Sequence, residues 1–207
     1  RQRHIVGRRA NRRPPMRDPV YHRYAGKALP GGNERCHLLA YHSLDVAAVG
    51  WHLLSPDRRL SQRLADALDI ALPELRRFLV FWLGLHDLGK FSRAFQGLLE
   101  IDWPGMVGSL GMPYVERHDR LGAVLWQAHW LTWWADGTLG YPGGAPDRTL
   151  RRALSGCLPI VAAPFFGHHG QPVAAGSVDI EAFFGVDERA DDRAAASVFV
   201  ADWAQLV

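Results

Sequence analysis

The sequence predicts an all-α protein with a single domain. Apolar residues recur at helical spacing in one segment after another, and no convincing run alternates apolar and polar residues as a strand would. The 207 residues are 48% hydrophobic and 22% charged, which is typical of a globular domain with a substantial core. Stretches rich in Gly and Pro separate the helical segments, as loops do. We therefore expect several helices packed around one core.

Four helices are expected in the first half of the chain. The first spans about 33–54, is capped by Asn33 and packs through one apolar face. Ser55-Pro56 begins the second, whose leucines recur to position 68. The third, at 72–88, is nearly continuously apolar and should be the buried helix, and a short helix or turn follows at 91–99. The apolar face of the first helix consists of Leu38, Tyr41, Leu44, Ala48 and Trp51.

Two long helices and a final one are expected in the second half. A loop over 101–113 precedes a tryptophan-rich helix at 116–135, which ends in the Gly- and Pro-rich segment 136–146. The next helix, at 150–166, is interrupted by Pro159 and Pro164 and ends at a Gly-His-His-Gly sequence. A short turn at 180–184 leads to the last helix, at about 190–206.

The positive charge of the chain is concentrated at its N-terminus. Six of the 24 basic residues lie within 1–15, where no acidic residue occurs, so the remainder carries 18 basic against 21 acidic residues. We assign residues 1–20 to a basic arm, which either contacts DNA phosphates or is an extension upstream of a start at Met16. Residues 21–207 form the folded domain.

The composition also indicates the compartment. No run approaches the roughly 18 apolar residues of a transmembrane helix, and the N-terminus lacks the apolar core of a secretory signal. Cys36 and Cys157 lie far apart and belong to no metal motif, as is typical of reduced thiols. We expect a cytoplasmic protein that has no membrane partner.

Histidine and aspartate residues provide the strongest functional signal. Imidazole and carboxylate together suit a hydrolytic metal site, because nitrogen holds the ion tightly while oxygen accommodates an exchanging water. A single His-Asp dipeptide is more often a surface pair, but six candidate ligands in four separate segments of one chain predict a metal centre at converging helix ends. The candidate ligands are His42, His86, Asp87, His118, His168 and His169.

Two further residues are candidates for roles beside these ligands. Asp45 lies three positions after His42 on one helix face, so we expect it to accept the second ring N–H of His42. Lys90 either positions a substrate phosphate and stabilises developing charge, or interacts with the helix dipole at a C-terminus. Residues 84–90 also match the start of a phosphate-binding P-loop, but Phe91 replaces the required Ser or Thr and no strand precedes it. We therefore reject an ATP site.

Several sequence blocks resemble the HD nuclease domain of the CRISPR-associated nuclease–helicase of type I systems. HLLAYHSLDVAAV, at 37–49, resembles the first motif of that family, and LHDLGKFSRAFQ, at 85–96, resembles its HD motif. Arg117-His118 and the sequence GHHG at 167–170 are similar to the third and fourth motifs, in the same order. YAGK, at 24–27, is similar to the short entry motif. The resemblance covers about residues 21–207.

This resemblance implies a helical HD-superfamily domain with a central two-metal site. Asp87 would complete one ion site and bridge to a second. The ligands implied for the first site are His42, His86 and Asp87, and those for the second are Asp87, His118, His168 and His169.

The family completes its first metal site with a distal aspartate in an Ala-Asp-Trp segment. Asp202 lies in such a segment, but it follows His169 by only 33 residues, and its helix resembles the one that usually precedes the true motif. Asp202 is therefore a weak candidate, and the first site is expected to hold its metal less tightly than the second. The helicase portion is not recognised, so we expect either a stand-alone subunit or a piece of a longer nuclease–helicase.

The implied activity is two-metal hydrolysis of phosphodiester bonds in single-stranded DNA, during CRISPR interference against foreign DNA. Asp87 and Lys90 are the candidate catalytic residues. The cofactors are two divalent ions, with Mn, Fe, Co or Ni favoured over Zn and with Mg as a further candidate. The expected partners are single-stranded DNA, the type I surveillance complex and a helicase domain, fused or separate. The alternatives are an HD phosphohydrolase that acts on nucleotides and a non-catalytic interaction module.

Overall fold

The computed structural model describes residues 18–28, 36–99, 101, 103–140, 144, 146–171, 173 and 178–207. Residues 1–17 of the basic arm and the expected cap at Asn33 lie outside these ranges. The described chain is mostly helical, which confirms the predicted class. The α-helices are α1 (Leu39–Leu53), α2 (Arg59–Leu68), α3 (Leu72–Leu85), α4 (Arg93–Leu99), α5 (His118–Ala135), α6 (Arg148–Phe166) and α7 (Asp192–Leu206). Shorter elements are the 3-10 helices η1 (Val20–Arg23), η2 (Leu88–Phe91) and η3 (Ile180–Ala182) and the strands β1 (Ala25–Ala28) and β2 (Cys36–Leu38).

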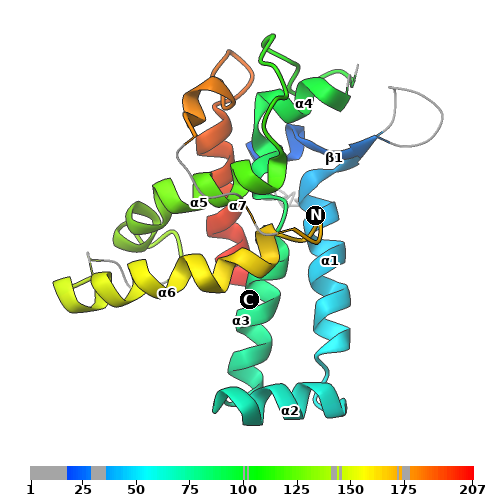
Figure 1. The fold of residues 1–207 in the computed structure, drawn as a ribbon. Coiled ribbons are helices and arrows are strands. Elements are labelled where there is room, and N and C mark those ends of the chain that lie inside the picture. The colour runs from blue at the N-terminus through cyan, green and yellow to red at the C-terminus, as the bar shows by residue number, and fades with distance from the viewer. Residues whose placement is uncertain are drawn as a thin grey trace, which may run out of the picture.

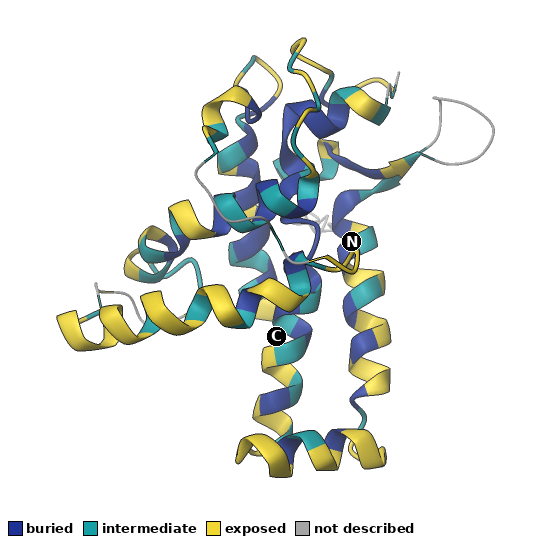
Figure 2. Cartoon of the chain, viewed as in Figure 1, coloured by how far each residue is buried: buried dark blue, intermediate teal, exposed yellow. Residues whose placement is uncertain are grey.

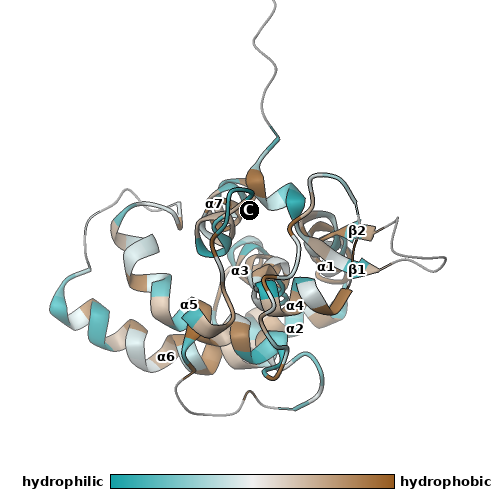
Figure 3. Cartoon of the chain, turned by 90° about the horizontal axis from the view of Figure 1, so that it is seen from above, coloured by the Kyte–Doolittle hydropathy of each residue, from teal (hydrophilic) through white to brown (hydrophobic). Residues whose placement is uncertain are grey.

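The long helices form two groups. Figure 1 shows α1 and α3 side by side, joined at one end by α2, which lies across both. The helices α5 and α6 pack against each other and extend to the other side of α3. Seen from above, α3 and α7 lie in the middle of the molecule, with α1 and the two strands on one side and α5 and α6 on the other (Figure 3). None of the described helices is long and apolar enough to cross a membrane.

The core lies where α3, α5 and α7 meet, and aromatic residues fill much of it. Trp82 of α3 packs edge-on against Trp126 of α5, with ring centroids 4.7 Å apart, and stacks on Phe165 of α6 at 5.8 Å. The buried residues gather in this central region, whereas α2 and the far end of α6 are largely exposed (Figure 2). The expected burial of the third helix is confirmed for its inner face, although Phe78 remains exposed.

The face that α1 buries differs from the expected one. Its small residues are buried, and Tyr41, Leu44 and Trp51 are exposed instead. The reason is the close approach of α3, because a Cβ placed on Gly50 would lie 2.2 Å from a methyl group of Leu83. Two helices this close have room only for small side chains between them.

A β-hairpin precedes α1, which corrects the expectation of a chain without strands. β1 and β2 pair antiparallel, with an irregular register between Ala25 and Lys27. β2 occupies the positions at which the first helix was expected to begin, so α1 starts only at Leu39. Strands of three and four residues are too short to show a period of two in the sequence.

The helix α6 continues through Pro159 and Pro164, which corrects the expected interruption. Both prolines lie on the exposed side of the helix. The carbonyl groups that lose a partner there can be hydrated, which limits the cost of each proline.

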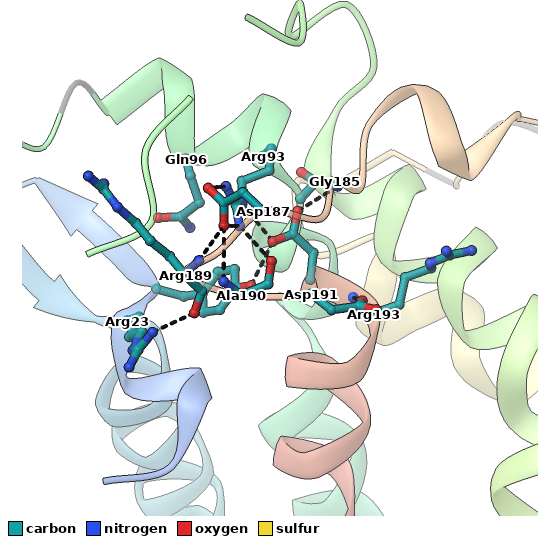
Figure 4. Close-up of polar contacts among 12 residues, drawn as sticks. Arg23, Arg93, Gln96, Gly185, Asp187, Arg189, Ala190, Asp191 and Arg193 are labelled. Carbon is teal, nitrogen blue, oxygen red and sulfur yellow. Dashed lines mark hydrogen bonds and ion pairs between the residues drawn. The ribbon is translucent and has the colours of Figure 1, made fainter. Parts of the chain in front are cut away.

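A buried ionic network fastens the start of α7 to α4 (Figure 4). Arg93 of α4 is completely buried, and its Nε donates to Asp192 Oδ1 at 2.7 Å. Its terminal nitrogens donate to both carboxylate oxygens of Asp187, at 2.7 and 2.9 Å. The hydroxyl of Tyr24 also donates to Asp192 Oδ1, at 2.6 Å. Residues more than 160 positions apart are thereby joined beside η2, the turn that follows the His-Asp pair.

Candidate metal centre

The six expected ligands come together at the ends of four helices. His42 lies in the first turn of α1, and His118 is the first residue of α5. His86-Asp87 follows the last residue of α3, and His168-His169 lies in the turn after α6. A side chain beyond a helix end can turn across the helix axis, so adjacent residues such as His86 and Asp87 can face the same point.

Asp87 occupies the centre of the cluster, and its two carboxylate oxygens face different histidines. Oδ2 lies 2.8 Å from His42 Nε2 and 3.1 Å from His86 Nε2. Oδ1 lies 3.3 Å from His118 Nε2 and 3.5 Å from His168 Nε2. The carboxylate therefore contacts histidines from all four segments.

His169 completes the second half of the cluster. Its Nε2 lies 3.0 Å from His118 Nε2, although its own ring is more exposed than the others. The donor atoms of His118, His168 and His169 all lie within 4.8 Å of one another, as do those of His42, His86 and Asp87. The group of His118, His168 and His169 contains the three histidines of the second implied set, and Asp87, which the resemblance assigns to both sets, lies in the other group.

Backbone carbonyl groups fix the orientation of two of the rings. His86 Nδ1 lies 2.7 Å from the carbonyl oxygen of Leu83, and His168 Nδ1 lies 3.0 Å from that of Phe165. A carbonyl oxygen only accepts, so Nδ1 carries the ring proton in each case and Nε2 keeps its lone pair. Both lone pairs are directed to the interior of the cluster, as metal ligation requires.

Tyr114 orients the ring of His118. Its hydroxyl oxygen accepts a hydrogen bond from the His118 backbone N–H at 3.0 Å and lies 2.8 Å from His118 Nδ1. Sequence reasoning missed this residue. Its one signal is the spacing of four between Tyr114 and His118, just before the helix begins.

The electrostatics of the cluster suit a cation. Burial by itself raises the pKa of Asp87, but the imidazoles of His118, His42 and His86 outweigh it and hold the pKa well below the usual range of a carboxyl group. Burial lowers the pKa of His168 and of His169, which favours the neutral ring. An ionised carboxylate together with imidazole nitrogens is the set of donors that divalent transition metals prefer.

A buried oxygen of Asp87 supports the same interpretation. The residue is 2% exposed, and among the described residues its Oδ1 has no partner with hydrogen-bond geometry. A buried carboxylate oxygen without a partner is costly, and a metal ion is a strong partner for it. The residues present therefore fit one ion in each group, with Asp87 between them.

Lys90 belongs to the cluster as well. Its ammonium lies 2.7 Å from Asp87 Oδ2 and donates to the carbonyl oxygen of Gly26 at 3.1 Å. It also lies over the ring of Phe95, at 5.2 Å. These contacts place a positive charge beside the carboxylate, which agrees better with a role at a phosphate than with a role at a helix dipole.

Asp45 does not contact His42 as expected. Its carboxylate lies 3.1 Å from His37 Nε2, and its side chain is 71% exposed. The ring of His42 turns inward to Asp87, while Asp45 stays on the solvent side, where His37 of β2 reaches it. Spacing along the helix predicted the neighbourhood correctly but not the direction of the two side chains.

Asp202 is not part of either ligand group in the part of the chain that the structure describes. Its Oδ2 accepts a hydrogen bond from the hydroxyl of Tyr21 at 2.8 Å. The next residue, Trp203, packs over Gly84 and donates to the carbonyl oxygen of Phe81 at 2.9 Å. Trp203 therefore faces α3 in the interior of the fold.

Two glycines allow the cluster to assemble. A Cβ on Gly89 would lie 1.9 Å from the carbonyl oxygen of His118, so only glycine lets the start of α5 reach η2. A Cβ on Gly26 would lie 3.1 Å from the Cβ of His42. Both glycines lie inside the quoted motifs, at 85–96 and 24–27, so the motifs specify packing as well as ligands.

Comparison with known proteins agrees with this geometry. Residues 26–207 match the family model described as "Cas3, HD domain". A stretch of 72 residues is 36% identical to the "CRISPR-associated endonuclease/helicase Cas3" of Escherichia coli (strain K12). That stretch is 35% of this chain and 8% of the relative, so the chain matches a small part of the relative's length. No solved structure matches. The match of the family model to nearly the whole described fold, together with the quoted motifs, shows that the chain belongs to the Cas3 HD domain family.

Proposed function

We propose that this chain is a metal-dependent nuclease that hydrolyses phosphodiester bonds of single-stranded DNA in type I CRISPR interference. One observation carries the proposal: Asp87 presents one oxygen to His42 and His86 and the other to His118 and His168. A carboxylate shared between two ligand groups is the arrangement of a two-metal hydrolase. The metals would supply a water that is deprotonated near neutral pH and would neutralise charge on the phosphate.

The residues of the chain divide this work between them. His86 and His168 are held by backbone carbonyls and present Nε2 to the cluster without rearrangement. Asp87 holds negative charge between the two groups. Lys90, 2.7 Å from Asp87 Oδ2, is placed to donate to a phosphate oxygen when a substrate lies against the cluster, which would stabilise the charge that develops there.

The surroundings of the cluster favour a polymer over a free nucleotide. His42 and His168 keep a quarter of their side-chain surface exposed, so the cluster is open to solvent on that side. Two cavities of about 600 Å³, formed by described residues, both lie outside the ligand set. A cluster that is open in this way suits a strand that passes across the surface.

The proposed cofactors are two divalent ions, with Mn, Fe, Co or Ni favoured over Zn because the sets combine histidine with a shared carboxylate. Mg remains a further candidate. The proposed partners are a helicase domain, fused or separate, and the type I surveillance complex, and the proposed location is the cytoplasm. The family supports the choice of divalent ions, and the similarity to an endonuclease/helicase supports the helicase as a partner.

The test uses circular single-stranded DNA, relaxed duplex DNA and a panel of nucleotides, each with Mn²⁺, Co²⁺ or Ni²⁺. We expect cleavage of the circular single strand only, and EDTA should stop it. Cleavage without metal, or ready cleavage of relaxed duplex, counts against the proposed site. Hydrolysis of the nucleotides alone would favour the phosphohydrolase.

The variant Asp87→Ala tests the shared carboxylate directly. We expect it to abolish cleavage, because it removes the residue common to both groups, while the helical circular dichroism is retained. Asp45→Ala is the matched control, since it also removes an acidic side chain from this region but one that faces solvent. Residual cleavage above a few per cent in a folded Asp87→Ala protein would contradict the two-metal assignment.

A further inference from the structure

A cavity of about 600 Å³ lies between η1, β2 and the loop around residues 103–106. Its lining includes His22, Leu38, Trp103 and Met106. The volume falls within the range of small-molecule sites in proteins. The cavity is separate from the metal-ligand cluster, and the proposed function uses none of its residues.

Aromatic rings line this cavity and lie beside it on α1. Trp103, in the lining, is 49% exposed. The ring of His22, also in the lining, lies 5.8 Å from that of Tyr41 at an interplanar angle of 31°. Tyr41 is half exposed and directly precedes the candidate ligand His42. Exposed rings such as those of Trp103 and Tyr41 are what single-stranded nucleic acids stack on.

Two arginines lie together at the edge of the cavity. Arg23 belongs to the lining, and its Nη1 donates to the carbonyl oxygen of Arg189. Arg189 Nη1 donates to the carbonyl oxygen of Met106 at 3.1 Å. Figure 4 shows both side chains at the border of the buried network, and both residues are exposed. Planar guanidinium groups bind phosphate oxygens and stack on bases. One acidic residue, Asp18, also lines the cavity.

The cavity lies close to the proposed metals along the chain. Leu38, in its lining, comes four residues before His42, which corresponds to about one helical turn, or roughly 6 Å of rise. The loop is fixed to η1, because Val107 N–H donates to the carbonyl oxygen of Arg23 at 3.0 Å. A strand bound at the cavity therefore has a short path past Tyr41 to the cluster.

We infer that this cavity is a base-binding subsite for single-stranded DNA, in which Trp103 stacks on a base while Arg23 and Arg189 contact the adjacent phosphates. The inference rests on the proposed function, because it assigns a binding place to the proposed substrate. The combination of exposed rings with guanidinium groups favours a nucleic acid over an apolar peptide. Only unpaired bases offer their faces to such rings, so duplex DNA is not expected to bind here.

Binding is measured by the anisotropy of a fluorescein-labelled oligo(dT) of 15 nucleotides, in EDTA so that no cleavage occurs. We expect Trp103→Ala to weaken binding about tenfold, since one base–aromatic stack is lost. Trp103→Phe should restore most of the affinity. The matched control is Trp51→Ala, which removes a similarly exposed tryptophan at the opposite end of α1 and should bind like the parent.

The inference is overturned if Trp103→Ala binds like the parent, if both tryptophan variants lose the same affinity, or if the parent does not bind oligo(dT). A cavity that serves a peptide partner would give the first of these results. The proposed function fails by a different readout, namely an absence of Mn²⁺-dependent hydrolysis of bis(p-nitrophenyl) phosphate by the parent protein. The two failures are therefore distinguishable.

Discussion

At the scale of the residue, the orientation of each imidazole determines how well the cluster can hold metal. Three of the rings have a polar partner at Nδ1: a carbonyl oxygen for His86 and for His168, and the hydroxyl of Tyr114 for His118. The carbonyl partners come from the helix that each histidine follows. The partner of His118 comes from the preceding loop and is a side chain, so a mutation can remove it.

We predict that Tyr114→Phe weakens metal binding in the group of His118, His168 and His169. When His118 Nε2 faces a metal, Nδ1 carries the ring proton and donates it to the Tyr114 hydroxyl. Loss of such a partner typically lowers metal affinity by about 10–100-fold. Isothermal titration calorimetry with Mn²⁺ measures the change in affinity. The group of His42, His86 and Asp87 serves as an internal control. An unchanged affinity in both groups would show that the hydroxyl has no such role.

A second prediction concerns the group of His42, His86 and Asp87, which should bind metal less tightly than the other. Asp202 accepts a hydrogen bond from Tyr21, and burial together with this bond raises the pKa of Tyr21 to about 12. Among the described residues, no further carboxylate belongs to the first group. We expect metal titration to resolve two unequal classes of site, of which His42→Ala removes the weaker. A tenfold or greater loss of affinity in Asp202→Asn would show instead that Asp202 is a ligand.

The sequence was sufficient to find the six clustered residues, because histidine- and aspartate-containing motifs rarely occur in four separate segments of one chain. It was not sufficient to place Asp45, since a spacing of three on a helix does not say which of two faces turns inward. Tyr114 was missed because a tyrosine in a loop carries no motif of its own. The direction in which a side chain points, and the residues that it contacts, depend on neighbours that are distant in the sequence.

At the scale of the element, close approaches of backbone position the helix ends. The short strands were missed because seven residues in two pieces show no alternation, and the buried face of α1 was misassigned because size, rather than hydrophobicity, selects it. Gly50 faces Leu83, and Gly89 faces the first turn of α5. Where helices are in close contact, the smallest residues mark the interface, although hydrophobic periodicity favours the larger ones.

We predict that Gly89→Ala separates α5 from η2. The new Cβ would lie 1.9 Å from the His118 carbonyl oxygen and 2.4 Å from the Gly122 backbone nitrogen, and backbone atoms cannot rotate away. Such a clash should lower the free energy of unfolding by about 1–3 kcal/mol or more and displace His118 from the cluster. Urea unfolding and metal titration measure the two effects.

The matched control for this variant is Gly156→Ala. Gly156 lies inside α6, and a Cβ there meets nothing within 4 Å. This substitution should stabilise the protein by about 0.5–1 kcal/mol, because alanine loses less backbone entropy than glycine in a helix. Equal effects of the two variants would contradict the proposed contact at Gly89.

At the scale of the whole molecule, the Arg93 network joins the N-terminal strand region, the HD segment and the last helix. Arg93 is fully buried between Asp187 and Asp192, and Tyr24 donates to the same Asp192. Burial lowers the pKa of Arg93, but the hydrogen bonds that its guanidinium donates to Asp187 and Asp192 outweigh it and raise the pKa. The guanidinium stays charged and holds the start of α7 beside η2. The sequence offered no sign of this network beyond the position of Arg93 in the HD block.

We predict that Arg93→Met unfolds α7 from the rest of the domain or destabilises the whole protein. The variant leaves the carboxylate of Asp192 buried without its cation, and breaking a buried pair in this way costs about 3–5 kcal/mol. Thermal unfolding followed by circular dichroism measures the loss. Arg193→Met is the matched control. Arg193 lies in the first turn of α7 next to Asp192, but its ion pair with Glu181 is longer, at 3.5 Å, and exposed.

The same network predicts how stability depends on pH. Hydrogen bonds from Arg93, aided by the N–H groups of Ala190 and Arg189, hold the pKa of Asp187 below its ordinary value. Because the pKa is lower in the folded state than in the unfolded state, this contribution is fully present above about pH 4 and is lost as the pH falls below it. Asp187→Asn should be less stable than the parent at pH 7, with the difference shrinking progressively between about pH 4 and pH 2. Urea midpoints measured across this range test the prediction, and a difference that stayed constant with pH would mean that the Asp187 charge does not stabilise the fold.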